Sequence, residues 1–147
     1  ALTQLAQHLR LADRVIFTGM VSPADVPRYY ALADAFVSAS ASEAQGLTYL
    51  EALAAGLPLL CRDDPCLKNL VQQGQNGYVW QNPAQLVRLS HTLLYRDDPD
   101  ALRKNAAASA RPYSAAAFAA AAEQLYRREI LRKTQQRQIL RREVVLW

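Results

Sequence analysis

Two carboxylates, Glu43 and Glu51, lie eight residues apart in the segment of the chain that is best suited to chemistry. Between them is Gly46, and an apolar run follows that ends at Gly56. This pattern predicts a loop, a helix that begins near Leu47, and a turn after a short buried helix. The N-terminus of a helix has unpaired N–H groups and the positive end of the helix dipole, so it can bind a phosphate.

The two acids are placed to bind a ligand with hydroxyl groups on both sides of a phosphate. Gly46 has no Cβ, so an anion can approach the backbone closely at this residue. Glu43, before the helix, and Glu51, inside it, can each accept hydrogen bonds from hydroxyls beside that anion. A sugar nucleotide has this layout. Considered alone, however, two Glu at this spacing are better explained as ordinary surface acids of an exposed helix.

Short apolar segments alternate with helical patterns along the chain. Strands are expected at residues 15–18, 35–37, 59–61 and 78–80. Helices are expected at about 1–11, 22–32, 47–55, 66–73, 83–95 and 99–110, and from 114 into the C-terminal tail. The alternation predicts an α/β fold, a Rossmann-like parallel sheet flanked by helices. We assign this domain to residues 1–112, and a C-terminal helix with a basic tail to residues 113–147.

Ligands in such folds bind beyond the carboxyl ends of the strands. The loop that holds Glu43 follows the second expected strand, and the loop around Gly19 follows the first. Both loops are therefore expected at the same edge of the sheet. Asp63 and Asp64 follow the third strand. Their side chains could face the ligand-binding cleft at the carboxyl ends of the strands. The preferred interpretation, however, is an exposed turn with Asp64 as a helix N-cap.

The composition of the chain is typical of a globular protein. The chain has 147 residues, 51% of them hydrophobic, which is enough for one domain with a core. No apolar run approaches the roughly 20 residues needed to span a bilayer. Cys61 and Cys66 have no second cysteine pair and no nearby His, so Cys61 is expected to be a buried structural thiol. The chain lacks an initiator Met and begins within an expected helix, so we expect a piece of a longer protein.

Charge is unevenly distributed along the chain. Residues 1–126 hold ten Lys and Arg against eleven Asp and Glu, whereas residues 127–147 hold seven against two. The near-neutral body lacks the basic face of a nucleic-acid-binding protein, so no nucleic-acid partner is expected. The tail combines basic and apolar residues, so it could lie at an anionic membrane surface. The alternative, slightly preferred, is a solvated helix whose apolar side covers another domain.

Five blocks of sequence follow one another in a characteristic order. They are Arg14 to Gly19, Ala33 to Ser38, Glu43 to Glu51, Ala55 to Pro58, and Gly74 to Gly77. In this order they resemble the group 1 family of retaining glycosyltransferases with the GT-B fold, whose E-x7-E signature matches Glu43 and Glu51. The sequence from Ser42 to Thr48 is most similar to that of bacterial glucosyltransferases that act on diacylglycerol.

The resemblance implies the donor-binding, C-terminal half of a GT-B enzyme that transfers a hexose with retention of configuration. Glu43 matches the family's acid beside the donor sugar and is the expected catalytic residue. Glu51 matches the acid that binds the ribose hydroxyls of the nucleotide. The expected donor is UDP-glucose, and the expected acceptor is diacylglycerol, in membrane glycolipid synthesis.

The remaining donor contacts implied by the resemblance come mainly from the backbone. The N–H groups of Gly46, Leu47 and Thr48 would hold the diphosphate and the sugar, and the loop at Gly19 and Met20 would lie near the base. No metal or other cofactor is expected, because the helix end and basic side chains offset the charge of the leaving diphosphate.

The resemblance also implies parts that this sequence does not contain. The family's Arg/Lys pair that clamps the diphosphate and its acceptor-binding N-terminal domain would both precede residue 14. We therefore expect no turnover from these residues alone, and we expect that domain as a partner. The expected location is cytoplasmic and peripheral at the inner face of the plasma membrane. The alternatives are a polysaccharide or protein acceptor, or a non-catalytic accessory module, against which the intact pair Glu43 and Glu51 argues.

Overall fold

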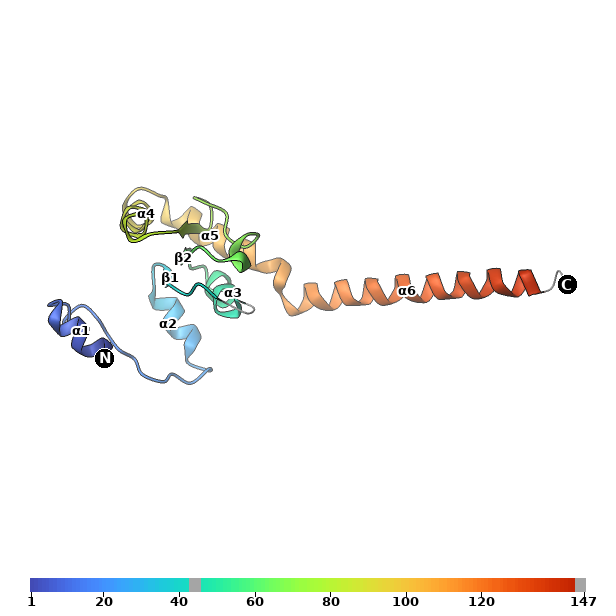
Figure 1. Ribbon diagram of the computed structural model, residues 1–147, viewed down its shortest axis with the longest axis horizontal. Helices are drawn as coiled ribbons and strands as arrows, with labels where there is room; N and C mark the ends of the chain where they lie inside the picture. Colours follow the sequence, from blue (N-terminus) through green and yellow to red (C-terminus); the bar gives the residue numbers. More distant parts are fainter. Residues whose placement is uncertain (43–45, 145–147) are drawn as a thin grey trace. The chain divides into compact units, whose positions relative to one another are not determined.

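A computed structural model describes residues 1–42 and 46–144 of the chain, and it divides into two compact units. The first unit is Ala1–Ala33, and the second begins at Asp34. The first unit contains helices α1 (Leu2–His8) and α2 (Val26–Leu32) (Figure 1). The sequence predicted Ser22 as the N-cap of the second of these helices and Pro23 as its first residue. Instead, residues 22–25 form a turn, and Asp25 is the N-cap.

Residues 15–18 form no strand, so the prediction from their β-branched and aromatic composition is wrong. These side chains are exposed, and Ile16 is 88% exposed. A strand is stable only where a neighbouring strand takes its backbone hydrogen bonds. In doubly wound sheets, a strand often pairs with one that comes earlier in the chain rather than later. The described residues contain no strand that pairs with residues 15–18.

The second unit is built on a parallel sheet of three strands. These are β1 (Phe36–Ser38), β2 (Leu59–Arg62) and β3 (Gly77–Trp80), and they lie in that order. In the central strand, Leu60 is paired with Val37 on one side and Tyr78 on the other. Parallel strands need crossover connections, and α3 (Leu47–Ala54) lies in the first of them. The predicted α/β class is therefore confirmed.

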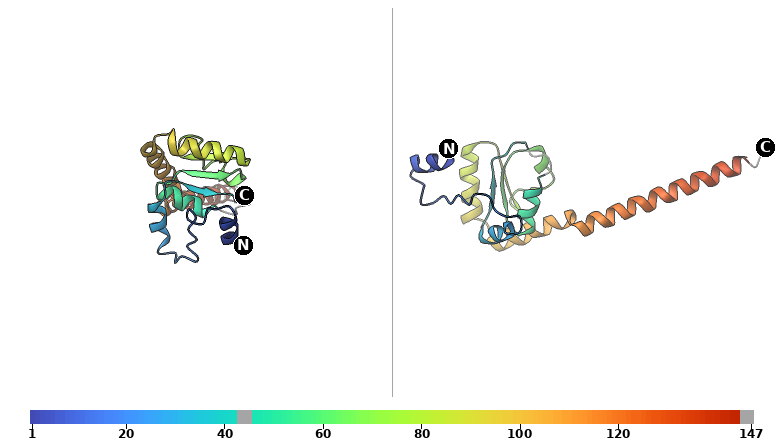
Figure 2. Two further views of the ribbon diagram at one scale, coloured as in Figure 1. Left: turned by 90° about the vertical axis from the view of Figure 1, so that its left-hand side faces the viewer. Right: turned by 90° about the horizontal axis from the view of Figure 1, so that it is seen from below.

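Helices cover both faces of this sheet. Helix α3 lies on one face, and α4 (Pro83–Tyr95) lies on the other (Figure 2). On the α4 side, a buried cluster combines Leu60 and Trp80 of the sheet with Leu89 and Leu93 of α4 and Leu102 of α5 (Pro99–Ala110). Helix α5 also packs against α3. Both faces of the central strand are covered, so Leu59 to Cys61 are buried, as their apolar run predicted. The edge strand β1 was also predicted to be buried, but its Val37 is 58% exposed.

The connection between β2 and β3 differs from the prediction of a helix at 66–73. Only a single 3-10 turn, η1 (Pro65–Leu67), forms there. The buried side chain of Asn76 forms hydrogen bonds with backbone groups of this segment, which a helix would pair with one another. Its amide donates to the Leu70 carbonyl at 2.9 Å and to Ser109 Oγ at 3.0 Å, and its Oδ1 accepts from the Gln72 N–H at 2.7 Å. These bonds replace helical ones and tie the loop to α5.

The other predicted helix starts are confirmed by their caps. Asn82 Oδ1 accepts from the Gln85 N–H at 3.0 Å, and Asp98 Oδ1 accepts from the Asp100 N–H at 3.0 Å. A short 3-10 turn, η2 (Arg111–Tyr113), leads from α5 into the 30-residue helix α6 (Ala115–Val144). Within the part of the chain that the structure describes, no helix is both long and apolar enough to cross a membrane.

Candidate donor site at the start of helix α3

Helix α3 begins on the side of the sheet where the strands end. Strand β1 ends at Ser38, and Gly46 is the N-cap of α3, with the left-handed angles φ 61° and ψ 29°. The Gly46 carbonyl accepts hydrogen bonds from the N–H groups of Tyr49, at 3.0 Å, and Leu50, at 3.3 Å. The N–H groups of the first turn, which includes Leu47, therefore lie where an α-helix leaves its donors without an intrahelical acceptor.

Tyr49 holds the start of α3 against the sheet. The side chain is completely buried, and its hydroxyl lies 3.2 Å from Ser38 Oγ. Its ring meets the ring of Phe36 edge-on, with 5.8 Å between the centroids. A Cβ at Gly46 would lie 3.0 Å from Tyr49 Cδ2 and 3.7 Å from Cys66 Sγ. A glycine is therefore needed here for its φ angle and for the space beside the tyrosine ring.

The predicted donor-binding residues of α3 lie on its exposed side. Leu47 is 58% exposed, and Thr48 and Glu51 are exposed as well. Leu47 and Glu51 are four residues apart, so they are neighbours on one face of the helix. The structure thus brings the carboxylate of Glu51 to the face that begins with the N–H groups of the first turn. Glu43, the other member of the predicted pair, lies outside the described residues.

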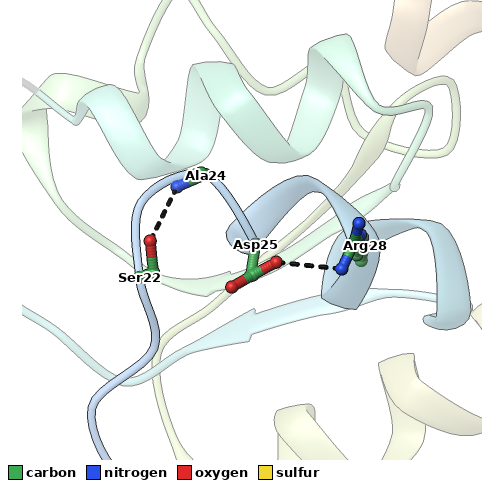
Figure 3. Close-up of polar contacts among 4 residues, drawn as sticks. All are labelled: Ser22, Ala24, Asp25 and Arg28. Carbon is green, nitrogen blue, oxygen red and sulfur yellow. Dashed lines mark hydrogen bonds and ion pairs between the residues drawn. The ribbon is translucent and has the colours of Figure 1, made fainter.

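Gly19 and Met20, expected near the base of a nucleotide, belong to the first unit. Gly19 has a φ of 67°, and no atom lies within 4 Å of the place where a Cβ would be. Met20 is fully exposed, at 104%. Both lie at or beside a shallow concavity of about 490 Å³, whose lining includes Met20, Asp25, Arg28 and Tyr29. Arg28 Nη1 donates to Asp25 Oδ1 at 3.0 Å (Figure 3).

The loop after β2 resolves the two interpretations of Asp63 and Asp64. Asp64 is the N-cap of η1, since its Oδ1 accepts from the Cys66 N–H at 2.9 Å. The predicted cap is therefore confirmed, but Asp64 is only 5% exposed, so this part of the turn is not at the surface. Asp63 is exposed, and its Oδ2 accepts from Gln81 Nε2 at 3.1 Å.

Asp63 and Gln81 line a groove of about 860 Å³ beside the carboxyl ends of β2 and β3. Two basic side chains, Lys68 and Arg88, line the same groove. None of the sequence motifs includes Gln81, Lys68 or Arg88. They come from separate loops and from α4, and no spacing in the sequence shows that they meet.

Cys61 is a buried structural thiol, as predicted. It is 0% exposed, and burial raises its pKa from 9.0 to about 12. A hydrogen bond with the backbone of Ser38 opposes this shift, and the nearby thiol of Cys66 adds to it. Among the described residues, no three His, Cys, Asp or Glu side chains are grouped so that they could hold a metal ion.

Residues 1–111 match the family model for group 1 glycosyl transferases. The chain belongs to this family. Among curated relatives, an alpha-monoglucosyldiacylglycerol synthase of Acholeplasma laidlawii is 41% identical over 128 residues, which are 85% of this chain and 32% of the relative. An enzyme of the same name from Streptococcus pneumoniae is 48% identical over 79 residues, which are 54% of this chain and 18% of the relative.

Among solved structures, a sucrose-phosphate synthase of Thermosynechococcus elongatus shares the fold, with a TM-score of 0.76 and 27% sequence identity. The similarity covers 88% of this chain and 33% of that protein. This group 1 glycosyltransferase chain therefore spans about a third, or less, of the length of the proteins that it matches.

Proposed function

We propose that this chain is the donor-binding part of a retaining glucosyltransferase that uses UDP-glucose and glycosylates diacylglycerol. The observation that carries the proposal is the start of α3, which opens at the carboxyl end of a parallel sheet in a chain of the group 1 family. The names of the relatives from Acholeplasma laidlawii and Streptococcus pneumoniae support glucose as the sugar and diacylglycerol as the lipid.

In this proposal, the diphosphate of the donor lies at the N-terminus of α3. The N–H groups of Gly46, Leu47 and Thr48 donate to its oxygens, and the helix dipole favours its negative charge. Glu51, on the same exposed face as Leu47, accepts hydrogen bonds from the ribose hydroxyls. Glu43 accepts hydrogen bonds from the sugar, and Gly19 and Met20 lie near the base.

The reaction breaks the bond between the sugar C1 and the diphosphate, and the electron pair of that bond leaves with the diphosphate. The acceptor hydroxyl forms the new bond on the same face of C1 and passes its proton to an oxygen of the leaving diphosphate. The groups at the start of α3 stabilise the negative charge that grows on the leaving diphosphate. They can do this without a metal ion, because the N–H donors are already oriented before the bond breaks.

The acceptor site belongs, in this proposal, to an N-terminal domain, so residues 1–147 alone give no turnover. A lipid acceptor places the whole enzyme on the cytoplasmic side of the plasma membrane, as a peripheral protein. A polysaccharide or protein acceptor would use the same donor site, and a non-catalytic accessory module would leave it empty. An assay of the full-length protein with UDP-glucose and diacylglycerol tests the lipid acceptor: formation of glucosyldiacylglycerol supports it, and the absence of this product contradicts it.

Calorimetric titration with UDP, GDP and UDP-glucose tests the donor site directly. Hydrogen bonds to a charged group contribute about 1.5–3 kcal/mol, so Glu51→Ala should weaken UDP binding roughly ten- to hundredfold. Glu123→Ala, which removes another exposed helical carboxylate, is the matched control and should bind UDP like the unaltered protein. An unchanged affinity of Glu51→Ala for UDP would contradict the ribose role. Failure of the full-length protein to bind any of the three ligands would overturn the donor-site proposal.

A further inference from the structure

Three hydrogen-bonding groups meet between the end of β1 and the start of α3. The hydroxyl oxygens of Ser38 and Tyr49 lie 3.2 Å apart, and Ser38 Oγ also accepts from the Ser40 N–H at 3.2 Å. A serine hydroxyl has two lone pairs and one hydrogen, so Ser38 can form both bonds at once. Ser38 ends β1, Tyr49 lies in the first turn of α3, and Ser40 lies in the loop that leaves the strand. The Ser38 hydroxyl therefore joins a strand, a loop and a helix.

The ring of Tyr49 is held in place by packing as well as by its hydroxyl. It meets the Phe36 ring edge-on and fills the space beside Gly46, where a Cβ would lie 3.0 Å from Tyr49 Cδ2. The side chain is completely buried, and closely packed interiors leave a large ring little freedom. The Tyr49 hydroxyl is therefore presented to Ser38 at a fixed point.

Ser38 and Ser40, in contrast, are only half-buried. A half-buried serine can change its rotamer, and its hydroxyl can bind water in place of a protein group. The bond to Tyr49 favours the rotamer in which Ser38 Oγ accepts from the Ser40 N–H. Because Ser40 is the second residue after β1, this bond sets the direction in which the loop leaves the sheet.

We propose that Ser38 and Tyr49 are positioning residues for the sugar of the donor. The inference rests on the proposed function, in which α3 binds the diphosphate and the ribose, and the loop after β1 leads to the sugar-binding Glu43. The buried Tyr49 hydroxyl orients the Ser38 hydroxyl, which in turn orients the start of the loop. In this role neither side chain needs to touch the donor, since each acts by fixing the loop relative to the start of α3.

UDP and UDP-glucose distinguish this positioning role from a general effect on stability. UDP uses the contacts of α3, whereas UDP-glucose also uses those of the loop. A loosened loop should therefore weaken the binding of UDP-glucose and leave that of UDP nearly unchanged. A loss of folded protein would instead raise the apparent Kd of both ligands by the same factor.

The test is calorimetric titration of the full-length protein with UDP and with UDP-glucose, in the absence of an acceptor. Tyr49→Phe removes the hydroxyl and keeps the ring, and Ser38→Ala removes both hydrogen bonds of Ser38 Oγ. Tyr78→Phe is the matched control, because it also removes a phenolic hydroxyl that forms a hydrogen bond. That hydroxyl donates to Asp97 Oδ2 at 2.8 Å, and Tyr78 lies in β3, which β2 separates from β1.

Tyr49→Phe should raise the Kd of UDP-glucose roughly two- to tenfold, the change expected for one hydrogen bond between uncharged groups. Ser38→Ala should raise it at least as much. The double variant should raise it by less than the product of the two single effects, because both substitutions break the same bond. The ratio of the two Kd values, for UDP-glucose and for UDP, should stay unchanged in Tyr78→Phe.

An equal rise for both ligands, or no rise for either, would overturn the positioning role and leave the donor site standing. A change of the ratio in Tyr78→Phe as large as that in Tyr49→Phe would overturn it too. If the unaltered protein binds neither ligand, the donor site falls and this inference falls with it. The unaltered protein thus tests the proposed function, and the comparison among the variants tests the roles of Ser38 and Tyr49.

Discussion

Replacing Gly46 with Ala should lower the free energy of unfolding by roughly 1–5 kcal/mol, because two penalties act at this residue. Its φ of 61° is left-handed, which costs an L-residue about 1–2 kcal/mol. The new Cβ would lie 3.0 Å from Tyr49 Cδ2. The tyrosine is completely buried and is held by Ser38 and Phe36, so relieving the contact should cost roughly 1–3 kcal/mol. The lower entropy of the unfolded Ala chain offsets about 0.4–1 kcal/mol.

Gly74→Ala is the matched control in the same unit. Its φ of 75° brings the same kind of backbone strain, but a Cβ there would meet its nearest atom, the Tyr78 hydroxyl oxygen, at an ordinary 3.5 Å. The difference between the two variants therefore isolates the contact with Tyr49. Urea denaturation of the three proteins measures it, and Gly46→Ala should be the less stable variant by roughly 1–3 kcal/mol. Equal destabilisation by both substitutions would refute the packing argument.

Two further predictions concern the paired strands β2 and β3. Gly77→Ala should destabilise the protein more than Gly46→Ala, because a Cβ would overlap the Leu59 carbonyl oxygen and lie 2.7 Å from the Leu59 nitrogen, and paired backbone cannot move aside. Urea denaturation showing Gly77→Ala to be as stable as Gly74→Ala would contradict this. The raised pKa of Cys61 predicts that the free energy of unfolding falls between about pH 9 and about pH 12, since the unfolded thiol loses its proton first. A plot of the free energy of unfolding against pH should be flatter over this range for Cys61→Ala than for the unaltered protein. An equally steep fall in both proteins would exclude the Cys61 thiol as the source of the fall.

Local sequence signals were sufficient wherever a few neighbouring residues determine the conformation. The caps at Asn82 and Asp98 act within the first turn of their own helices, so their types and positions revealed them. The turn that ends at Gly77 was predicted for the same reason, as was the cap at Asp64. The apolar runs of β1, β2 and β3 predicted parallel strands, and β2 is buried from Leu59 to Cys61 as predicted, whereas Val37 of the edge strand β1 is 58% exposed.

Predictions failed where a segment depends on distant partners. Residues 15–18 have the composition of a strand, but strand formation requires hydrogen bonds from a neighbour. The helix expected at 66–73 shortened to η1 because Asn76, farther along the chain, takes hydrogen bonds of that segment. The predicted turn at Asp64 is buried for a similar reason, since burial depends on what packs over a residue and not on its type.

In the candidate donor site, too, some features follow from the local sequence and others from contacts made in the folded protein. The sequence by itself determined which residues can do chemistry: the acids Glu43 and Glu51, and the glycine that begins α3. Their types and spacing are local properties. Only the tertiary structure decided that Gly46 faces Tyr49, that Tyr49 is fixed by β1, and that Asp63 meets Gln81. The contacts of Tyr49 with β1 and of Asp63 with Gln81 join residues from separate elements, and the packing of those elements around the sheet brings them together.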